Sequence, residues 1–224
     1  CGAPHATPIP SSYPPALDGF RPSALRRTYA EVAGSDSAWV SAVRSAIGKV
    51  SPCSAPGPSS LSGAHLHGVA DIASAYFVDA LADFCDVVAS GRVPARLTAS
   101  RLVAIPKPAG GVRPIGIGET LRRVIGRLAN DVLVAQLGPG LEADGQLGIA
   151  VAGAARAHHR VRNAVARGHA AVFLDVENAF NALDRRAAFA IFDSLQSPAA
   201  PLVRALYGYA SPILHAGNAS PPFS

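Results

Sequence analysis

Residues 173–181 of this chain read FLDVENAFN. The run from Ala170 to Leu174 is short, uncharged and largely apolar, which predicts a β-strand buried on both faces. Asp175 would then stand at the carboxyl end of that strand. Because a hard Mg²⁺ ion needs oxygen ligands held on a rigid element, Asp175 is a candidate metal ligand. Many α/β proteins end a strand in Asp, so the pattern needs support from elsewhere in the chain.

Residues 101–116 supply this support and read RLVAIPKPAGGVRPIG. They predict a strand, a Pro/Gly turn and a returning strand, because Gly110 and Gly111 give the backbone the freedom that a tight hairpin needs. Lys107 starts the turn and Arg113 lies on the return, so both cations can reach one side of the hairpin. A compact ammonium and a planar guanidinium together suit a triphosphate. A basic surface hairpin without a ligand is the alternative.

Together these segments resemble the reverse transcriptase domain of non-LTR retrotransposons. The similarity is close over residues 102–123, 144–148 and 173–185, weaker over 55–59, and covers roughly residues 53–215. It implies an α+β fold: a partial right-hand polymerase, with helical fingers, a β-hairpin and the start of a ferredoxin-like palm. We therefore expect a Pro/Ser/Ala-rich segment and a helix over residues 1–52, and a partial reverse transcriptase domain over residues 53–224.

The resemblance also implies a role for individual residues. Asp175 would be the first catalytic carboxylate and, together with the backbone carbonyl of Val176 and a later pair of aspartates, would hold the two Mg²⁺ ions that promote phosphoryl transfer. Lys107 and Arg113 would contact the phosphates of the incoming deoxynucleoside triphosphate. Phe180 would lie beneath its sugar and exclude a 2′-hydroxyl by steric clash. A core position in an amphipathic turn is the alternative for Phe180.

Two later motifs of this family are absent from the sequence. No Asp-Asp pair occurs, and no Gln-Gly-Asp-Pro-like segment precedes the end of the chain at Ser224. The chain begins with Cys1 and contains no Met, so we expect a fragment of a longer translation product. The resemblance implies that the longer protein is an RNA-directed DNA polymerase, and the fragment, which holds one of its three metal-binding carboxylates, is expected to be inactive alone. A non-catalytic nucleic-acid-binding remnant of a retroelement is the alternative. An RNA-templated RNA polymerase is a third and weaker one.

Positive charge is concentrated in one part of the chain. The net charge is +5, and residues 101–167 hold ten Lys/Arg against four Asp/Glu. Such an excess favours a polyanionic partner, although a solvated basic face is also possible. By resemblance, the partners are an RNA template, a DNA primer and deoxynucleoside triphosphates. The candidate nucleic-acid-binding residues are Arg122, Arg123, Arg127, Gln146, Arg156, Arg160 and Arg162.

Cysteine content and hydropathy argue against a disulfide-rich, a zinc-binding and a membrane-inserted protein. Three Cys without metal-ligand spacing indicate neither a disulfide framework nor a zinc site. No run of eighteen apolar residues and no signal peptide is present, so we expect no membrane insertion and an intracellular protein, nuclear or cytoplasmic. The oligomeric state stays open.

Apolar periodicity predicts the remaining elements. We expect a helical pattern over residues 23–48 and a helix over 69–90 that exposes Asp79, Asp83 and Asp86. Gly138-Pro139-Gly140 should break the chain. Further helices are expected over residues 152–166, from Asp184 to Leu195 and over 200–209, with an extended segment at 211–215.

Overall fold

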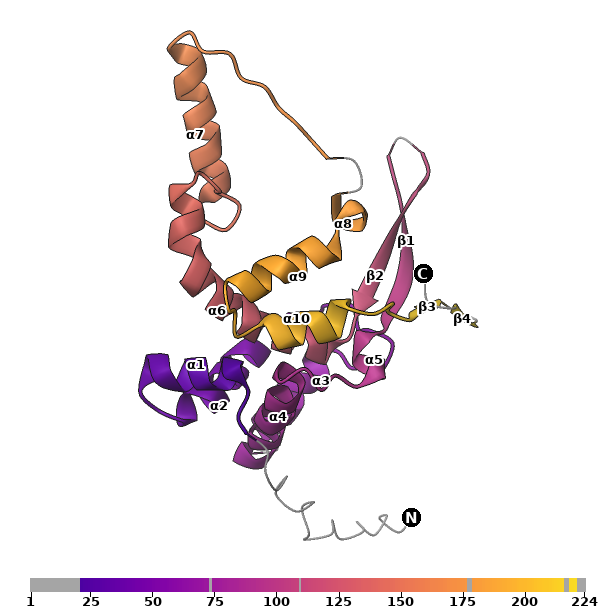
Figure 1. The fold of residues 1–224 in the computed structure, drawn as a ribbon. Helices are drawn as coiled ribbons and strands as arrows, with labels where there is room; N and C mark the ends of the chain where they lie inside the picture. Colours follow the sequence, from indigo (N-terminus) through magenta and orange to yellow (C-terminus); the bar gives the residue numbers. More distant parts are fainter. Residues whose placement is uncertain (1–20, 73, 109, 177–178, 216–217, 221–224) are drawn as a thin grey trace, which may run out of the picture.

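The computed structural model describes residues 21–72, 74–108, 110–176, 179–215 and 218–220, which combine many helices with one small sheet (Figure 1). The helices are α1 (Ala24–Ala33), α2 (Ser37–Gly48), α3 (Gly63–Ile72), α4 (Ser74–Ala89), α5 (Ala95–Thr98), α6 (Thr120–Ala143), α7 (Gly153–Ala166), α8 (Ala179–Ala182), α9 (Arg185–Ser194) and α10 (Ala200–Tyr207). The strands are β1 (Ser100–Pro106), β2 (Val112–Gly118), β3 (Ile213–His215) and β4 (Asn218–Ser220). The mixed helix and strand content agrees with the predicted α+β class.

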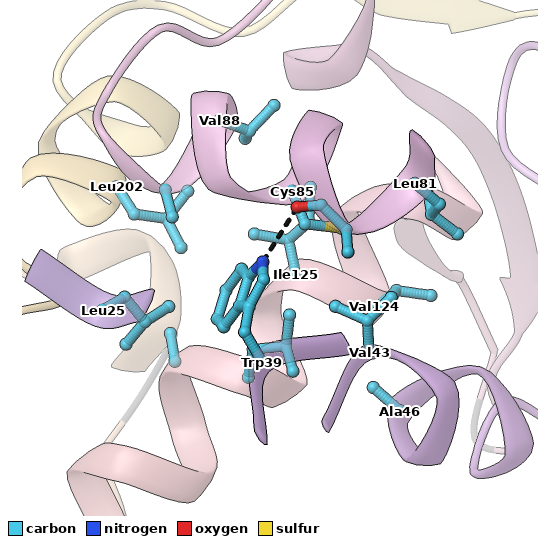
Figure 2. Packing of buried hydrophobic residues seen from close by; sticks show 14 of the residues in the cluster. Leu25, Trp39, Val43, Ala46, Leu81, Cys85, Val88, Val124, Ile125 and Leu202 are labelled. Carbon is cyan, nitrogen blue, oxygen red and sulfur yellow. Dashed lines mark hydrogen bonds between the residues drawn. The ribbon is translucent and has the colours of Figure 1, made fainter. Parts of the chain in front are cut away.

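The hydrophobic core lies among α1, α2, α4, α6 and α10 (Figure 2). Trp39 is fully buried there, and its indole nitrogen donates a hydrogen bond to the carbonyl of Ala82 at 2.9 Å. The rings of Tyr29 and Trp39 meet edge-on, with their centroids 5.5 Å apart. The hydroxyl of Tyr29 donates a hydrogen bond to the Leu128 carbonyl at 3.1 Å. Both polar atoms of these aromatic side chains are thus satisfied. Residues 24–48 therefore share one core with the helices that follow residue 53.

The predicted helices at the N-terminal end are present with different boundaries. The pattern over residues 23–48 forms two helices, α1 and α2, because Gly34 adopts a left-handed conformation (φ 66°) that ends α1. The helix predicted over residues 69–90 is present as α3 and α4, which lie on either side of residue 73, and the helical structure begins earlier than predicted, at Gly63.

Asp86 is buried, and its predicted exposure was wrong. Its Oδ1 accepts from the backbone N–H of Ser23 at 2.9 Å, and its Oδ2 accepts from Nη1 of Arg26 at 3.2 Å. The carboxylate thus holds the start of α1 against α4. Periodicity could not show this, because the partners lie sixty or more residues away in the sequence.

The predicted hairpin is confirmed. Strands β1 and β2 are antiparallel, with Ser100 opposite Gly118 at the base and Pro106 opposite Val112 near the tip. Gly110 and Gly111 both have positive φ, 91° and 81°, which the turn requires. The extended segment after α10 is confirmed as β3, which pairs parallel with the base of β1, and the sheet order is β2-β1-β3-β4.

The Gly138-Pro139-Gly140 segment does not break the chain, so this prediction was wrong. It lies inside α6, which continues to Ala143. Proline has no N–H to donate, but the backbone N–H groups of Asp144 and Gln146 still bond the carbonyls of Gly140 and Leu141, at 3.0 and 2.8 Å. These two bonds close the C-terminal end of α6, and the missing donor of Pro139 does not end the helix. The helix predicted over residues 152–166 is confirmed as α7.

The predicted buried strand before Asp175 was wrong. Residues 169–176 have no regular structure and run from the far end of α7 back toward α8, in orange in Figure 1. Their apolar side chains are exposed, and Leu174 is 92% accessible. A strand exists only with backbone partners, and none of the described strands pairs with this segment.

The two helices at the C-terminal end follow the prediction. Asp184 caps α9 by accepting from the backbone N–H of Arg186 at 2.9 Å, and this hydrogen bond lowers the pKa of the Asp184 carboxyl. Helix α10 packs against α9. Within the described ranges, no helix has both the length and the apolar character that crossing a bilayer demands.

Candidate nucleotide and nucleic-acid interface

The loop over residues 51–62 is clamped to the junction between β2 and α6. The backbone N–H and the hydroxyl of Ser59 donate to the two carboxylate oxygens of Glu119, at 2.8 and 2.6 Å. The Thr120 hydroxyl donates to the carbonyl of Leu61. Gly57 lies so close that a Cβ there would stand 2.7 Å from the Cα of Glu119. These contacts fix the point at which the hairpin leaves the helical core.

The hairpin places its two cations on one face. Arg113 pairs directly with Ile105 across the strands, and directly paired residues point to the same face. Lys107 follows Ile105 by two residues, and its N–H bonds the Gly111 carbonyl at 3.0 Å, so the alternation of the strand continues to it. Both side chains are exposed and have no hydrogen-bond or salt-bridge partner in the described part of the chain.

Arg122 and Arg123 contact the protein itself. A guanidinium nitrogen of Arg122 donates to the Thr98 carbonyl at 3.3 Å, and the group stacks over the ring of Tyr207 at 4.9 Å. Arg123 donates to the carbonyl of Ala55 at 2.7 Å and to the Thr120 hydroxyl at 3.0 Å. Both arginines are half-buried: Arg122 holds the ends of α5 and α10 against α6, and Arg123 holds the loop over residues 51–62. Arg127 on the same helix is exposed.

Of the candidate residues around α7, two contact the protein itself and two are exposed. Arg156 forms an ion pair with Glu142 at 2.6 Å, which joins α7 to the end of α6. The side-chain carbonyl of Gln146 accepts from the N–H of Gly148 at 2.9 Å and so shapes the connecting turn. Arg160 and Arg162 are exposed, and neither has a partner among the residues that the structure describes.

Asp175 lies on the irregular, exposed segment before α8. Its Oδ1 accepts from the N–H of its neighbour Val176 at 3.0 Å, and both residues are open to solvent. No further metal ligand joins Asp175 and the Val176 carbonyl: within the described ranges, no group of three His, Cys, Asp or Glu side chains comes together. Phe180 belongs to α8, but its side chain lies outside the described part, as do residues 177 and 178.

The structure therefore separates the candidate residues into distinct places. The hairpin bearing Lys107 and Arg113 extends to one side of the core, and α7 with Arg160 and Arg162 projects on the other (Figure 1). Sequence reasoning missed the joint between Ser59 and Glu119. The one available signal was the similarity of residues 55–59 to a loop at the entrance of polymerase fingers.

A search against known protein-family models found no match, and a search against curated proteins found none either.

Proposed function

We propose that this chain is the fingers-like part of an RNA-directed DNA polymerase, a part that grips the triphosphate of a deoxynucleotide and the backbone of nucleic acid. The observation that carries the proposal is the pair of unpartnered cations, Lys107 and Arg113, on one face of an exposed hairpin. A polyphosphate takes up such charges, because each cation can form a charge-assisted hydrogen bond to phosphate oxygen.

The rest of the described structure supports this assignment. A hairpin that grips a ligand needs a firm base, and the Ser59–Glu119 and Arg123–Ala55 hydrogen bonds provide it. The exposed Arg127, Arg160 and Arg162 supply further charge for a nucleic-acid backbone. The two Mg²⁺ ions of the proposed reaction would activate phosphoryl transfer. Of the described residues, Asp175 and the backbone carbonyl of Val176 would contribute ligands to them.

Equilibrium binding of a fluorescent deoxynucleoside triphosphate to the 224-residue chain tests the proposal. Arg113→Ala should weaken binding by about tenfold, or about 1.4 kcal/mol, because one charge-assisted contact is lost. Arg44→Ala on α2, also an exposed arginine, is the matched control and should bind as the unchanged chain does. The matching monophosphate should bind more weakly than the triphosphate. Equal affinities of the two variants would remove the assignment of Arg113.

A second candidate function, a nucleic-acid-binding protein without polymerase chemistry, is favoured by the position of Asp175. Its carboxylate lies on an irregular segment, whereas a metal ligand works best on a rigid element. Primer extension on an RNA template with Mg²⁺ and all four deoxynucleotides separates the two functions in any longer chain that contains this sequence. There, Asp175→Asn should abolish extension if the first function holds, and extension should be absent from the start if the second does.

A further inference from the structure

A cavity of about 520 Å³ lies where loop 51–62, α4, α5, α6 and β3 meet. Its volume falls in the range of small-molecule binding sites. The walls are mainly apolar and include the side chains of Leu61, Phe84, Leu97, Leu121 and Leu214. Lys107 and Arg113, the hairpin cations, do not line it.

Three polar or charged residues line this cavity: Ser59, Arg96 and Glu119. Glu119 is only 6% exposed, and both of its carboxylate oxygens accept from Ser59. A carboxylate offers about four lone-pair positions, so acceptor capacity remains. Glu119 precedes the first residue of α6, where the helix dipole stabilises a negative charge. No cation pairs with the Glu119 side chain among the residues that the structure describes.

We infer that this cavity binds a small amphipathic cation, an ammonium group carried by an aromatic or branched apolar body. The ammonium donates to the Glu119 carboxylate, which gains the charged partner that a buried carboxylate favours. The apolar body lies among the leucines and Phe84 and leaves water. Arg96 is exposed, so solvent screens its repulsion of the ligand.

The location gives such a ligand a mechanical consequence. Glu119 connects the last residue of β2, Gly118, to the first residue of α6, Thr120. A ligand held between Glu119 and the leucine walls therefore braces the base of the hairpin against α4 and α6. Neither the hairpin cations nor Asp175 takes part in this binding, which therefore does not depend on the proposed polymerase function.

Titration of the full 224-residue chain with three matched probes, followed by NMR, tests this inference. The probes are 2-phenylethylammonium, 2-phenylethanol and phenylacetate, which share an aromatic body and differ in charge. The ammonium should bind at least tenfold more tightly than phenylacetate, with the alcohol between them. Glu119→Gln should remove the preference for the ammonium, and Arg96→Ala should keep it.

A second variant guards against a folding defect in Glu119→Gln. Leu61 is half-buried, so Leu61→Trp can place its larger ring in the cavity and should abolish binding of all three probes while the circular dichroism spectrum stays unchanged. Three results would each overturn the inference: no binding to the unchanged chain, equal affinity for the three probes, or binding that survives in Leu61→Trp.

Discussion

Cys85 lies within the helical core on α4 and is fully buried, whereas Cys53 in the loop over residues 51–62 is exposed. Burial, with a smaller contribution from the charge of Asp86, raises the pKa of the Cys85 thiol to about 12. The neutral thiol is therefore the form that the fold stabilises. The contribution of the neutral thiol to the free energy of unfolding is fully present below the ordinary thiol pKa of about 8.5 and is lost as the pH rises toward 12.

These two environments predict selective alkylation. Because the thiolate is the reacting form, iodoacetamide at pH 8 should modify Cys53 rapidly and leave Cys85 intact in the folded chain. Peptide mass spectrometry after short exposures measures both sites, and the same reaction in denaturant is the control that should modify both. Rapid modification of Cys85 without denaturant would show that α4 does not pack as described.

The sequence predicts only in part which cations of the basic region are exposed. The exposure of Lys107 and Arg113 follows from a basic, Pro/Gly-rich turn, and sequence alone predicts it. The inward contacts of Arg122 and Arg123 do not follow, because their partners, Thr98, Ala55 and the Tyr207 ring, come from other segments. A basic cluster in a sequence therefore overstates the number of cations that are available to a ligand.

At the scale of elements, the sequence predicts the hairpin, which depends on neighbouring residues, and misjudges a strand, which depends on pairing with distant residues. The hairpin needed only two β-prone runs and two glycines, all within nineteen residues, Ser100–Gly118. Residues 170–174 have the composition of a strand, but strand formation requires a neighbour from elsewhere in the chain, which composition cannot reveal. The Pro139 break is a local signal that failed: proline removes one N–H donor, and α6 nevertheless continues to Ala143.

The clamp between loop 51–62 and α6 gives a prediction at this scale. In Gly57→Ala, the added methyl would meet the backbone of Glu119 and Gly118 at 2.7–2.8 Å, so the loop must move away. We expect a loss of about 1–3 kcal/mol in the free energy of unfolding, as overpacking typically costs. Urea denaturation followed by circular dichroism measures it.

The matched control for that variant is Gly140→Ala, at a helical position where a Cβ meets nothing within 4 Å. Alanine favours the helix over glycine, so this change should stabilise the chain slightly, by up to about 1 kcal/mol. If Gly57→Ala proved as stable as the unchanged chain, the clamp would not hold the loop.

At the scale of the whole molecule, one helical core carries two separate basic projections, the hairpin β1–β2 and the helix α7 (Figure 1). The hairpin is the proposed triphosphate grip, and α7 is the proposed contact with the nucleic-acid backbone. Arg156 is held by Glu142, so Arg160 and Arg162 are the cations of α7 that we expect to meet phosphates. Each such contact releases counterions, which makes binding depend on salt concentration.

The most direct test of nucleic-acid gripping is fluorescence anisotropy of a labelled RNA–DNA duplex, titrated with the 224-residue chain at several salt concentrations. Affinity should fall as salt rises. In Arg160→Ala/Arg162→Ala about two phosphate contacts are lost, so the slope of log affinity against log salt should become shallower by about 1.8. Arg44→Ala/Lys49→Ala removes the same charge from the region of α2 and should leave the slope unchanged. A salt-independent affinity, or equal slopes for the two double variants, would contradict the account.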